Sequence, residues 1–478
     1  MPDASTAQTH GRWTAAVVAA FGLALMAGCG VMAPTHERPA APIPATWPSV
    51  LVAGTSDTTV MPSDWATFFP DPRLQAMIAA ALEHNRDLRL AVARVDEARA
   101  TYGVQRADRL PNLQLGATRT ITQTPAALSS TGLETTSRRV DVNVGLLAFE
   151  LDFWGRVASL SEAAKASYLA TEEAQRSFRL SLIADVADAY WAWQEASERV
   201  VLARHTWTTR SDVYRMMQTR RDVGLAGDLE VLQAQGAVES ARAEWSALER
   251  QLGLSENLLR VLVGLERSEW PAGQPLKHQG PTSELQVGLP ADVLLQRPDI
   301  MAAEHRLRAS NAMIGAARAA FFPRVALTGS FGSASPELSG LFDAKTTAWT
   351  FMPSLSLPLF SGGRLASNLD LAAARKEVAI AEYERIIQQA FREVADGLIA
   401  RQTLREQRAA LHALEQTQAQ RLAIAQARFE QGVASFLEVL DAQRELFNAQ
   451  QGVVAAQRAF HSASARLYKA LGGGAHRD

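Results

Sequence analysis

The sequence predicts a mainly α-helical protein with a β-layer, built from one helix–strand–strand–helix–helix unit that occurs twice. Three observations lead to this prediction: an internal repeat, four segments of alternating apolar and polar residues, and two very long stretches without proline. The repeat is clearest at 218–235 and 426–443, where Gly224 and Gly432 hold the same place and 432 − 224 gives an offset of 208. Copies of this length suggest a symmetric assembly rather than a solenoid, whose repeats have about 20–50 residues.

The composition argues against several classes of function. The chain has 478 residues, a net charge of −2 and one cysteine, so no nucleic-acid surface is expected. Phosphate-binding loops, nucleophile-elbow motifs and cysteine pairs are not found in the sequence. His412 and Glu415 share a helix face, which we interpret as ordinary helix surface rather than a metal pair. We therefore expect that the protein is not an enzyme. We also expect that it binds no metal, no nucleic acid and no cofactor other than a covalent lipid.

The N-terminus predicts export and a lipid anchor. Arg12 precedes the apolar run 13–27, so residues 1–28 read as a signal peptide. The end of this run, Leu25-Met26-Ala27-Gly28-Cys29, resembles the lipobox of bacterial lipoproteins, although Met26 stands where such proteins usually have leucine. Lipidation of Cys29 is the prediction, and an ordinary secretory signal is the alternative. In such lipoproteins an aspartate directly after the cysteine commonly signals retention in the inner membrane. Here Gly30 follows the cysteine, so we expect the protein in the outer membrane. The proline-rich residues 29–63 are expected to form an extended tether.

Each repeat, 64–264 and 291–472, should begin with a helix followed by two strands. In the first repeat the helix spans Pro72–Arg109 and ends before Pro111, because proline cannot continue a helix. Period-two alternation predicts the strands, with apolar positions at Leu113, Leu115, Ala117; Val140, Val142, Val144, Leu146; Val325, Leu327, Phe331; and Trp349, Phe351, Leu355, Leu357, Leu359. Four strands cannot close a barrel in lipid, where open edges are not tolerated. Either the layer is soluble, or several copies pool their strands.

Two long helical hairpins follow the strands. Residues 156–223 contain no proline or glycine, which predicts a helix on the order of 100 Å long. Residues 364–431 are similar apart from Gly397. Each helix should end at a glycine turn and return to Gly264 or Gly472. Residues 265–290 are expected to link the repeats, and 473–478 to form a tail.

At this level the chain resembles the TolC-type outer membrane factors, specifically the NodT-type efflux lipoproteins. The resemblance covers nearly the whole mature chain and is carried by the lipobox, the two turn motifs, residues 150–156 (Glu-Leu-Asp-Phe-Trp-Gly-Arg) and residues 288–300 (Gly-Leu-Pro-Ala-Asp-Val-Leu-Leu-Gln-Arg-Pro-Asp-Ile). It implies a homotrimer that shares a 12-stranded transmembrane β-barrel and a long α-helical periplasmic barrel. It further implies an outer-membrane exit duct for drugs or toxic compounds, supplied by an inner-membrane pump of the RND type and a periplasmic adaptor.

The resemblance also places a gate at the hairpin tips. The residues that it implies are Gly224, Asp228, Glu230, Phe429, Gly432, Glu438 and Asp441. Glu438 and Asp441 would ring the mouth, and Phe429 matches a latch position often held by tyrosine. Ala434 stands where some relatives have a latch arginine, which puts a charged latch in doubt. The alternative to a channel is a lipid-anchored periplasmic coiled-coil scaffold with a soluble β-layer.

Overall fold

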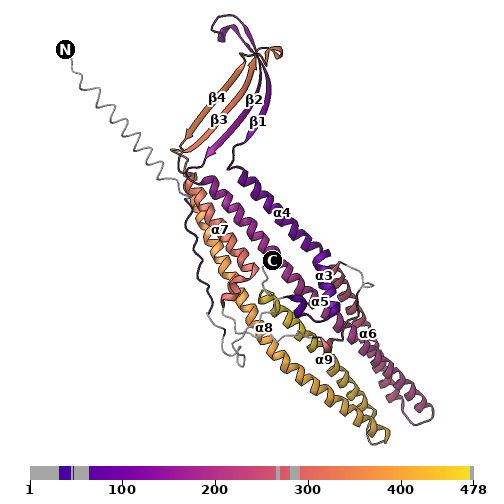
Figure 1. Cartoon of the computed structure of the whole chain (residues 1–478). Helices are drawn as coiled ribbons and strands as arrows, with labels where there is room; N and C mark the ends of the chain where they lie inside the picture. Colours follow the sequence, from indigo (N-terminus) through magenta and orange to yellow (C-terminus); the bar gives the residue numbers. More distant parts are fainter. Residues whose placement is uncertain (1–31, 45–46, 48–63, 265–269, 280–290, 474–478) are drawn as a thin grey trace, which may run out of the picture. The chain divides into compact units, whose positions relative to one another are not determined.

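The computed structural model describes residues 32–44, 47, 64–264, 270–279 and 291–473. The signal peptide, Cys29, most of the tether and linker, and residues 474–478 lie outside these ranges. Figure 1 shows the elements. In chain order they are α2 (Trp65–Phe68), α3 (Pro72–His84), α4 (Arg86–Ala107), β1 (Leu113–Thr124), η2 (Ala126–Leu128), β2 (Thr135–Leu151), α5 (Arg156–Asp222), α6 (Asp228–Val263), η4 (Leu276–His278), η5 (Ala291–Gln296), α7 (Pro298–Ala319), β3 (Arg324–Ser335), η6 (Leu338–Gly340), β4 (Thr347–Ser356), α8 (Arg364–Glu430) and α9 (Phe436–Ala470).

The chain divides into two compact units, and each unit combines segments from both repeats. The first contains residues 1–40, 95–171 and 302–383, and therefore the whole sheet. The second contains residues 41–94, 172–301 and 384–478, and therefore both hairpin tips. Among the described residues, no helix is long and apolar enough to cross a membrane.

The first unit is built on a four-stranded antiparallel sheet in the order β1-β2-β3-β4 (Figure 1). The strand predictions are confirmed, except that Leu357 and Leu359 follow the end of β4. Pro358 explains this end, because proline has no N–H for a ladder bond. Pro353 lies within β4 opposite Leu327, and β4 is an edge strand, where proline is tolerated.

The two faces of the sheet differ in chemistry. The register pairs Leu115 with Val144, Val144 with Phe331, and Phe331 with Trp349, so these side chains share one face. That face is apolar and exposed, with Leu113, Leu115, Val144, Phe331, Trp349, Phe351 and Leu355 all at least 46% accessible. The adjacent row of paired residues, which lies on the opposite face, consists of small and polar residues: Gly116, Asn143, Gly332 and Ala348. A sheet with one exposed apolar face is suited to contact with lipid.

Residues 150–156 form the joint between β2 and α5. The Arg156 guanidinium donates to both oxygens of Glu150, at 2.8 and 2.7 Å, and Arg324 at the start of β3 also donates to Glu150, at 2.5 Å. The Trp154 indole donates to the carbonyl of Pro323 at 2.9 Å. Gly155 has φ +69°, a left-handed conformation that glycine adopts without strain. The motif therefore ties β2, β3 and α5 together.

The described part of the N-terminal segment packs along α7. Arg318 donates to the Met32 carbonyl at 3.4 Å, and Asn311 donates to that of Pro34 at 2.6 Å. Buried Glu304 accepts hydrogen bonds from Arg308, at 2.6 Å, and from Arg38. Gly315 lies against Ala33, where an added Cβ would come within 2.8 Å of that residue. Residues 32–38 thus lie along α7 and are held to it by these contacts.

The second unit holds α6, α9 and the parts of α5 and α8 from residues 172 and 384 onward, where α5 forms a hairpin with α6 and α8 one with α9 (Figure 1). Both outgoing helices have 67 residues and end within one residue of the predicted positions. The helix predicted at 72–109 is instead broken at Asn85. Its backbone is extended, with φ −60° and ψ 127°. The Asn85 side chain accepts from the Leu88 N–H at 2.9 Å and donates to the Leu262 carbonyl at 2.9 Å. The bond from Leu88 is a helix N-cap, for which asparagine is preferred and which the sequence could have indicated, whereas the bond to Leu262 depends on the fold.

Polar side chains lock the core of this unit. The Tyr190 hydroxyl donates to Asp71 at 2.7 Å, and Gln194 donates to Tyr190 at 2.7 Å. Burial and then the hydrogen bond to Asp71 raise the pKa of Tyr190. The indole of buried Trp191 donates to Gln279 at 2.8 Å, so Trp191 is the packing residue that its helical position indicates.

Candidate functional site at the hairpin tips

Both hairpins reverse at a glycine in the left-handed conformation. Gly224 has φ +74° and Gly432 has φ +75°. In each turn the residue after the glycine bonds back to the helix: the Leu225 N–H donates to the backbone carbonyl of Arg220 at 2.7 Å, and the Val433 N–H donates to that of Arg428 at 3.0 Å. This geometry is that of a helix C-cap, for which glycine is the preferred residue. The two sequence copies thus give two equivalent turns.

An apolar cluster joins the two tips. It contains Met217, Val231 and Ala234 from the first hairpin and Ala425, Phe436, Val439 and Ala442 from the second. Phe429 packs against this cluster, with its ring 5.6 Å from that of Phe436. The Arg220 guanidinium lies 5.3 Å from the centre of the Phe429 ring, within cation–π range. Phe429 therefore contributes to the contact between the hairpins.

The acidic candidates at the tips have different surroundings. The Glu230 carboxylate accepts the N–H of Gly227 at 3.1 Å and so caps the start of α6. Asp228 and Glu438 are exposed at the starts of α6 and α9. Within the described residues, the carboxylate of Glu438 makes no hydrogen bond and no ion pair. Asp228 interacts with the positive charge of Arg221, so Glu438 is the candidate whose charge is least compensated.

Asp441 is held between two arginines. Arg421 of α8 donates to one of its oxygens at 2.5 Å, and Arg444, one turn further along α9, donates to the other. The sequence interpretation overlooked both partners. Arg421 lies eleven residues before Gly432 and Asp441 nine residues after it. An antiparallel hairpin brings such positions together, so this spacing was an available signal.

A further arginine, Arg210, is enclosed near this network. It donates to the Ala237 carbonyl at 3.2 Å, while its buried Nε has no hydrogen-bond partner in the part of the chain that the structure describes. Burial, and then the positive charge of Arg444, lower the pKa of Arg210. The tips therefore carry positive as well as negative groups, which the sequence interpretation did not anticipate.

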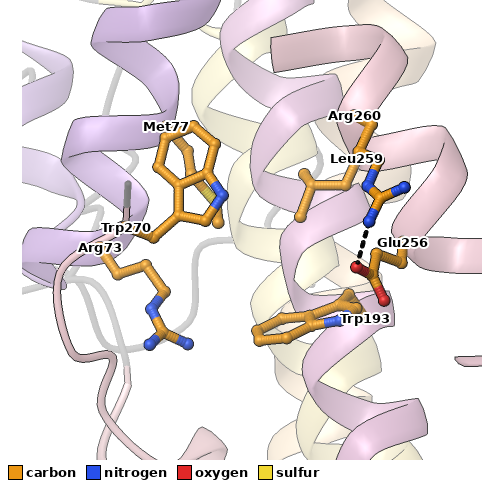
Figure 2. A pocket seen from close by; sticks show the side chains of 7 residues that line it. All are labelled: Arg73, Met77, Trp193, Glu256, Leu259, Arg260 and Trp270. Atoms are coloured by element: carbon orange, nitrogen blue, oxygen red, sulfur yellow. Dashed lines mark hydrogen bonds and ion pairs between the residues drawn. The ribbon is translucent and has the colours of Figure 1, made fainter. Parts of the chain in front are cut away.

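Figure 2 shows a hollow in the same unit, away from the tips. It contains about 500 Å³ of empty space, part of it open to solvent. Arg73 lies 5.6 Å from the Trp193 ring and donates to the Pro271 carbonyl at 2.6 Å. Arg260 pairs with Glu256 at 3.0 Å. The charged groups lining this hollow already have partners. Among the described residues, no group of three or more His, Cys, Asp or Glu could hold a metal ion.

The chain matches the family model described as "Outer membrane efflux protein" over residues 77–265 and 289–473. It is 44% identical to the solvent efflux pump outer membrane protein SrpC of Pseudomonas putida over 463 residues, which cover 95% of this chain and 97% of SrpC. It is 43% identical to the outer membrane protein OprJ of Pseudomonas aeruginosa over 458 residues, which cover 96% and 95% of the two chains.

Solved structures agree with these matches. A membrane protein from Pseudomonas aeruginosa is similar with a TM-score of 0.86 and 42% identity, over 93% of this chain and 98% of the other. The MtrE outer membrane channel of Neisseria gonorrhoeae, solved in its open state, is similar with a TM-score of 0.84 and 36% identity, over 93% and 98%. Sequence and fold thus point to the same group of proteins.

Proposed function

The chain belongs to the outer membrane efflux protein family, and on that premise we propose that three copies form the passive exit duct of a tripartite efflux system. The observation that carries this proposal is the sheet, which has one exposed apolar face and two unpaired edges, β1 and β4. In lipid, unpaired edges are not tolerated. Three copies with four strands each would give a closed barrel of twelve strands, an even number as in other such barrels.

The mass of the detergent-solubilised protein tests the trimer. We expect three chains per particle, migration as a trimer in SDS that heating converts to monomer, and ion conductance in a planar bilayer. A stable monomer that keeps its β-structure would overturn the proposal. A scaffold without a channel would conduct no ions, and its β-layer would have no need of the exposed Leu115, Phe331 and Trp349.

The tips would receive a periplasmic adaptor that connects the duct to an inner-membrane pump of the RND type. Apolar side chains exposed at both turns support this docking, namely Val223, Leu225, Leu229, Val433 and Leu437. A cysteine at Leu229 should form crosslinks to the adaptor, whereas one at exposed Arg385, far along α8 from the turn, should not. The duct has no catalytic role.

Hydrophobic toxic compounds are the proposed cargo. SrpC is named for solvent efflux, and its similarity extends over nearly the whole chain. A strain without this gene should lose tolerance to toluene and regain it from a plasmid copy. Unchanged tolerance in a strain with no substitute channel would exclude solvents as cargo.

Cys29 is proposed to carry the lipid. The docked segment supports this role, because Met32, three residues later, contacts Arg318 near the end of α7. The described chain that follows Cys29 in sequence therefore docks near the end of α7, the helix that precedes β3. Cys29→Ser should abolish labelling with palmitate, and label retained on this variant would refute the anchor.

The acidic part of the gate is proposed to rest mainly on Glu438. Three copies would place three such carboxylates around the axis, where their repulsion would favour binding of multivalent cations. Asp441 contributes less, since Arg421 and Arg444 compensate its charge.

A further inference from the structure

A hollow lies on the apolar face of the sheet, where the β3–β4 connection folds over β1 and β2. It contains about 1000 Å³ of empty space open to solvent. The connection contributes residues 336–339, and beneath it Val140 is only 7% exposed. The strands contribute Ala117, Thr118, Arg119, Arg138, Val140 and Val142. The hollow therefore combines apolar side chains with two arginines.

The register places both arginines on the apolar face. Arg119 is paired with Val140, and Arg138 with Ile121, in the same alternation as Leu115 with Val144. Their neighbour Arg139 points to the opposite face and is neutralised by Asp141, with Nε–O distances of 2.8 and 2.9 Å. Arg119 and Arg138 make no ion pair within the described residues. Two unpaired cations next to an apolar surface require an explanation.

The position of Arg119 and Arg138 along the strands explains why they lack partners within the described part of the chain. From Leu151 to Val140, β2 advances eleven residues, about 36 Å of strand, which a tilt of about 40° reduces to some 27 Å across the membrane. This matches the apolar band of about 25 Å typical of such sheets. Arg138 is the next residue on the same face, and Arg119 is level with Val140. Both arginines therefore lie where the apolar band ends, on the side away from the helices and thus at the outer leaflet.

We propose that this hollow binds the phosphorylated headgroup of an outer-leaflet lipid. Arg119 and Arg138 would bond the phosphate oxygens, because the planar guanidinium matches phosphate geometry and basic pockets beside apolar surfaces bind lipid phosphates. The acyl chains would lie along Val142 and Val144. Exposed Glu337 also lines the hollow, so its formal charge is +1 from two arginines and one glutamate. The inference rests on the proposed trimeric barrel, which sets the strand tilt and puts the sheet in the outer membrane, but not on the gate.

The test is retention of lipid by the full-length protein in detergent, counted by native mass spectrometry. The probes are diphosphorylated lipid A and its dephosphorylated form. We expect lipid A to be retained in preference to the dephosphorylated form. Arg119→Gln with Arg138→Gln should reduce its affinity at least tenfold, the weight of one charge-assisted hydrogen bond. Arg139→Gln is the matched control, one residue away on the opposite face, and should keep the parent affinity.

Glu337→Gln provides a gain of function that does not depend on removing a contact. It removes the carboxylate from the hollow and should tighten lipid A binding about threefold through the weaker repulsion. Equal retention of the dephosphorylated form, an equal loss in Arg139→Gln, or no gain in Glu337→Gln would overturn the proposal. Displacement of lipid A by millimolar inorganic phosphate would also overturn it, in favour of a soluble-anion site. Channel conductance of each variant, expected to be unchanged, separates this result from a failure of the duct itself.

Discussion

Glu230 and Glu438 occupy the same position in the two repeats, three residues into their helices, yet only Glu230 accepts a hydrogen bond from the residue that precedes its helix. The Gly227 N–H donates to the Glu230 carboxylate at 3.1 Å, whereas within the described residues the N–H of Ser435, at the matching place before α9, donates to no side chain. Duplication has thus produced two glutamates in equivalent places, one serving local structure and one left with its charge uncompensated.

Because of this difference, Glu230 can serve as the matched control for Glu438 in measurements of channel block by cations. Glu438→Gln should raise the concentration of a trivalent cation needed for half-block of the channel in a planar bilayer, by about tenfold if one charge contact is lost. Glu230→Gln should change it little and leave the start of α6 intact, because the glutamine carbonyl can still accept the Gly227 N–H. Equal effects of both substitutions on block would show that the two glutamates face the same space.

Removing a partner of Asp441 should act in the opposite direction. Arg421→Gln frees one carboxylate oxygen of Asp441, so the mouth becomes more negative and cation block should strengthen. Thermal stability should change by less than about 1 kcal/mol, because exposed pairs contribute little. The half-blocking concentration and the melting temperature measure the two effects. A weaker block in this variant would place Asp441 away from the ion path.

The two kinds of glycine in the first hairpin should respond differently to alanine. Gly224 has φ +74°, so Gly224→Ala should destabilise the hairpin by about 1–2 kcal/mol. Gly236 is exposed within α6 with no heavy atom within 4 Å of an added Cβ, so Gly236→Ala should stabilise it by about 0.5–1 kcal/mol. Melting followed by far-UV circular dichroism compares them, and a shift of the same sign in both variants would contradict the assigned turn.

Arg297 should be a main determinant of stability in the second unit. Its buried guanidinium donates to Asp299 at 2.7 Å, Glu393 at 2.9 Å and the Ala470 carbonyl at 2.7 Å. Arg297→Met leaves all three acceptors without their cation and should cost about 3 kcal/mol. Exposed Arg385→Met is the control and should change the melting temperature little. An equal change of melting temperature in the two variants would mean that water replaces the buried guanidinium without loss of stability.

His461 should make stability depend on pH. Burial, opposed by its hydrogen bond to the Leu276 carbonyl, lowers its pKa from 6.5 to about 4. Between pH 6.5 and pH 4, His461 therefore binds a proton more readily in the unfolded chain than in the folded protein. The contribution of neutral His461 to the free energy of unfolding is fully present above pH 6.5 and falls by roughly 3 kcal/mol as the pH approaches 4.

The melting temperature of the parent should consequently fall between pH 6.5 and 4, and His461→Gln should flatten that part of the profile. His412, an exposed histidine paired with Glu415, provides the control, since His412→Gln should leave the profile as it is. The same slope in parent and His461→Gln would assign the acid sensitivity to other groups.

The sequence by itself determined the elements and the duplication. Period-two alternation at Leu113–Ala117 and Val140–Leu146, and the long stretch without proline or glycine before Gly224, are local signals that backbone geometry converts directly into strands, a helix and a turn. The two long helices end within one residue of the predicted positions, whereas β1 continues to Thr124 and β2 runs from Thr135 to Leu151, beyond the alternation that predicted them. The same patterns showed which sheet face is apolar, because alternation assigns every second side chain to one face.

Only the tertiary structure decided what each polar side chain does. The bond of Asn85 to the Leu262 carbonyl, 177 residues away, depends on the fold. The compensation of Asp441 depends on Arg421 across the hairpin, and the placement of Arg119 beside Arg138 depends on the strand register. Charge compensation depends on distance in space, which a linear pattern does not contain. The sequence could therefore nominate Glu230, Glu438 and Asp441 together, and the packing of the helices separated them.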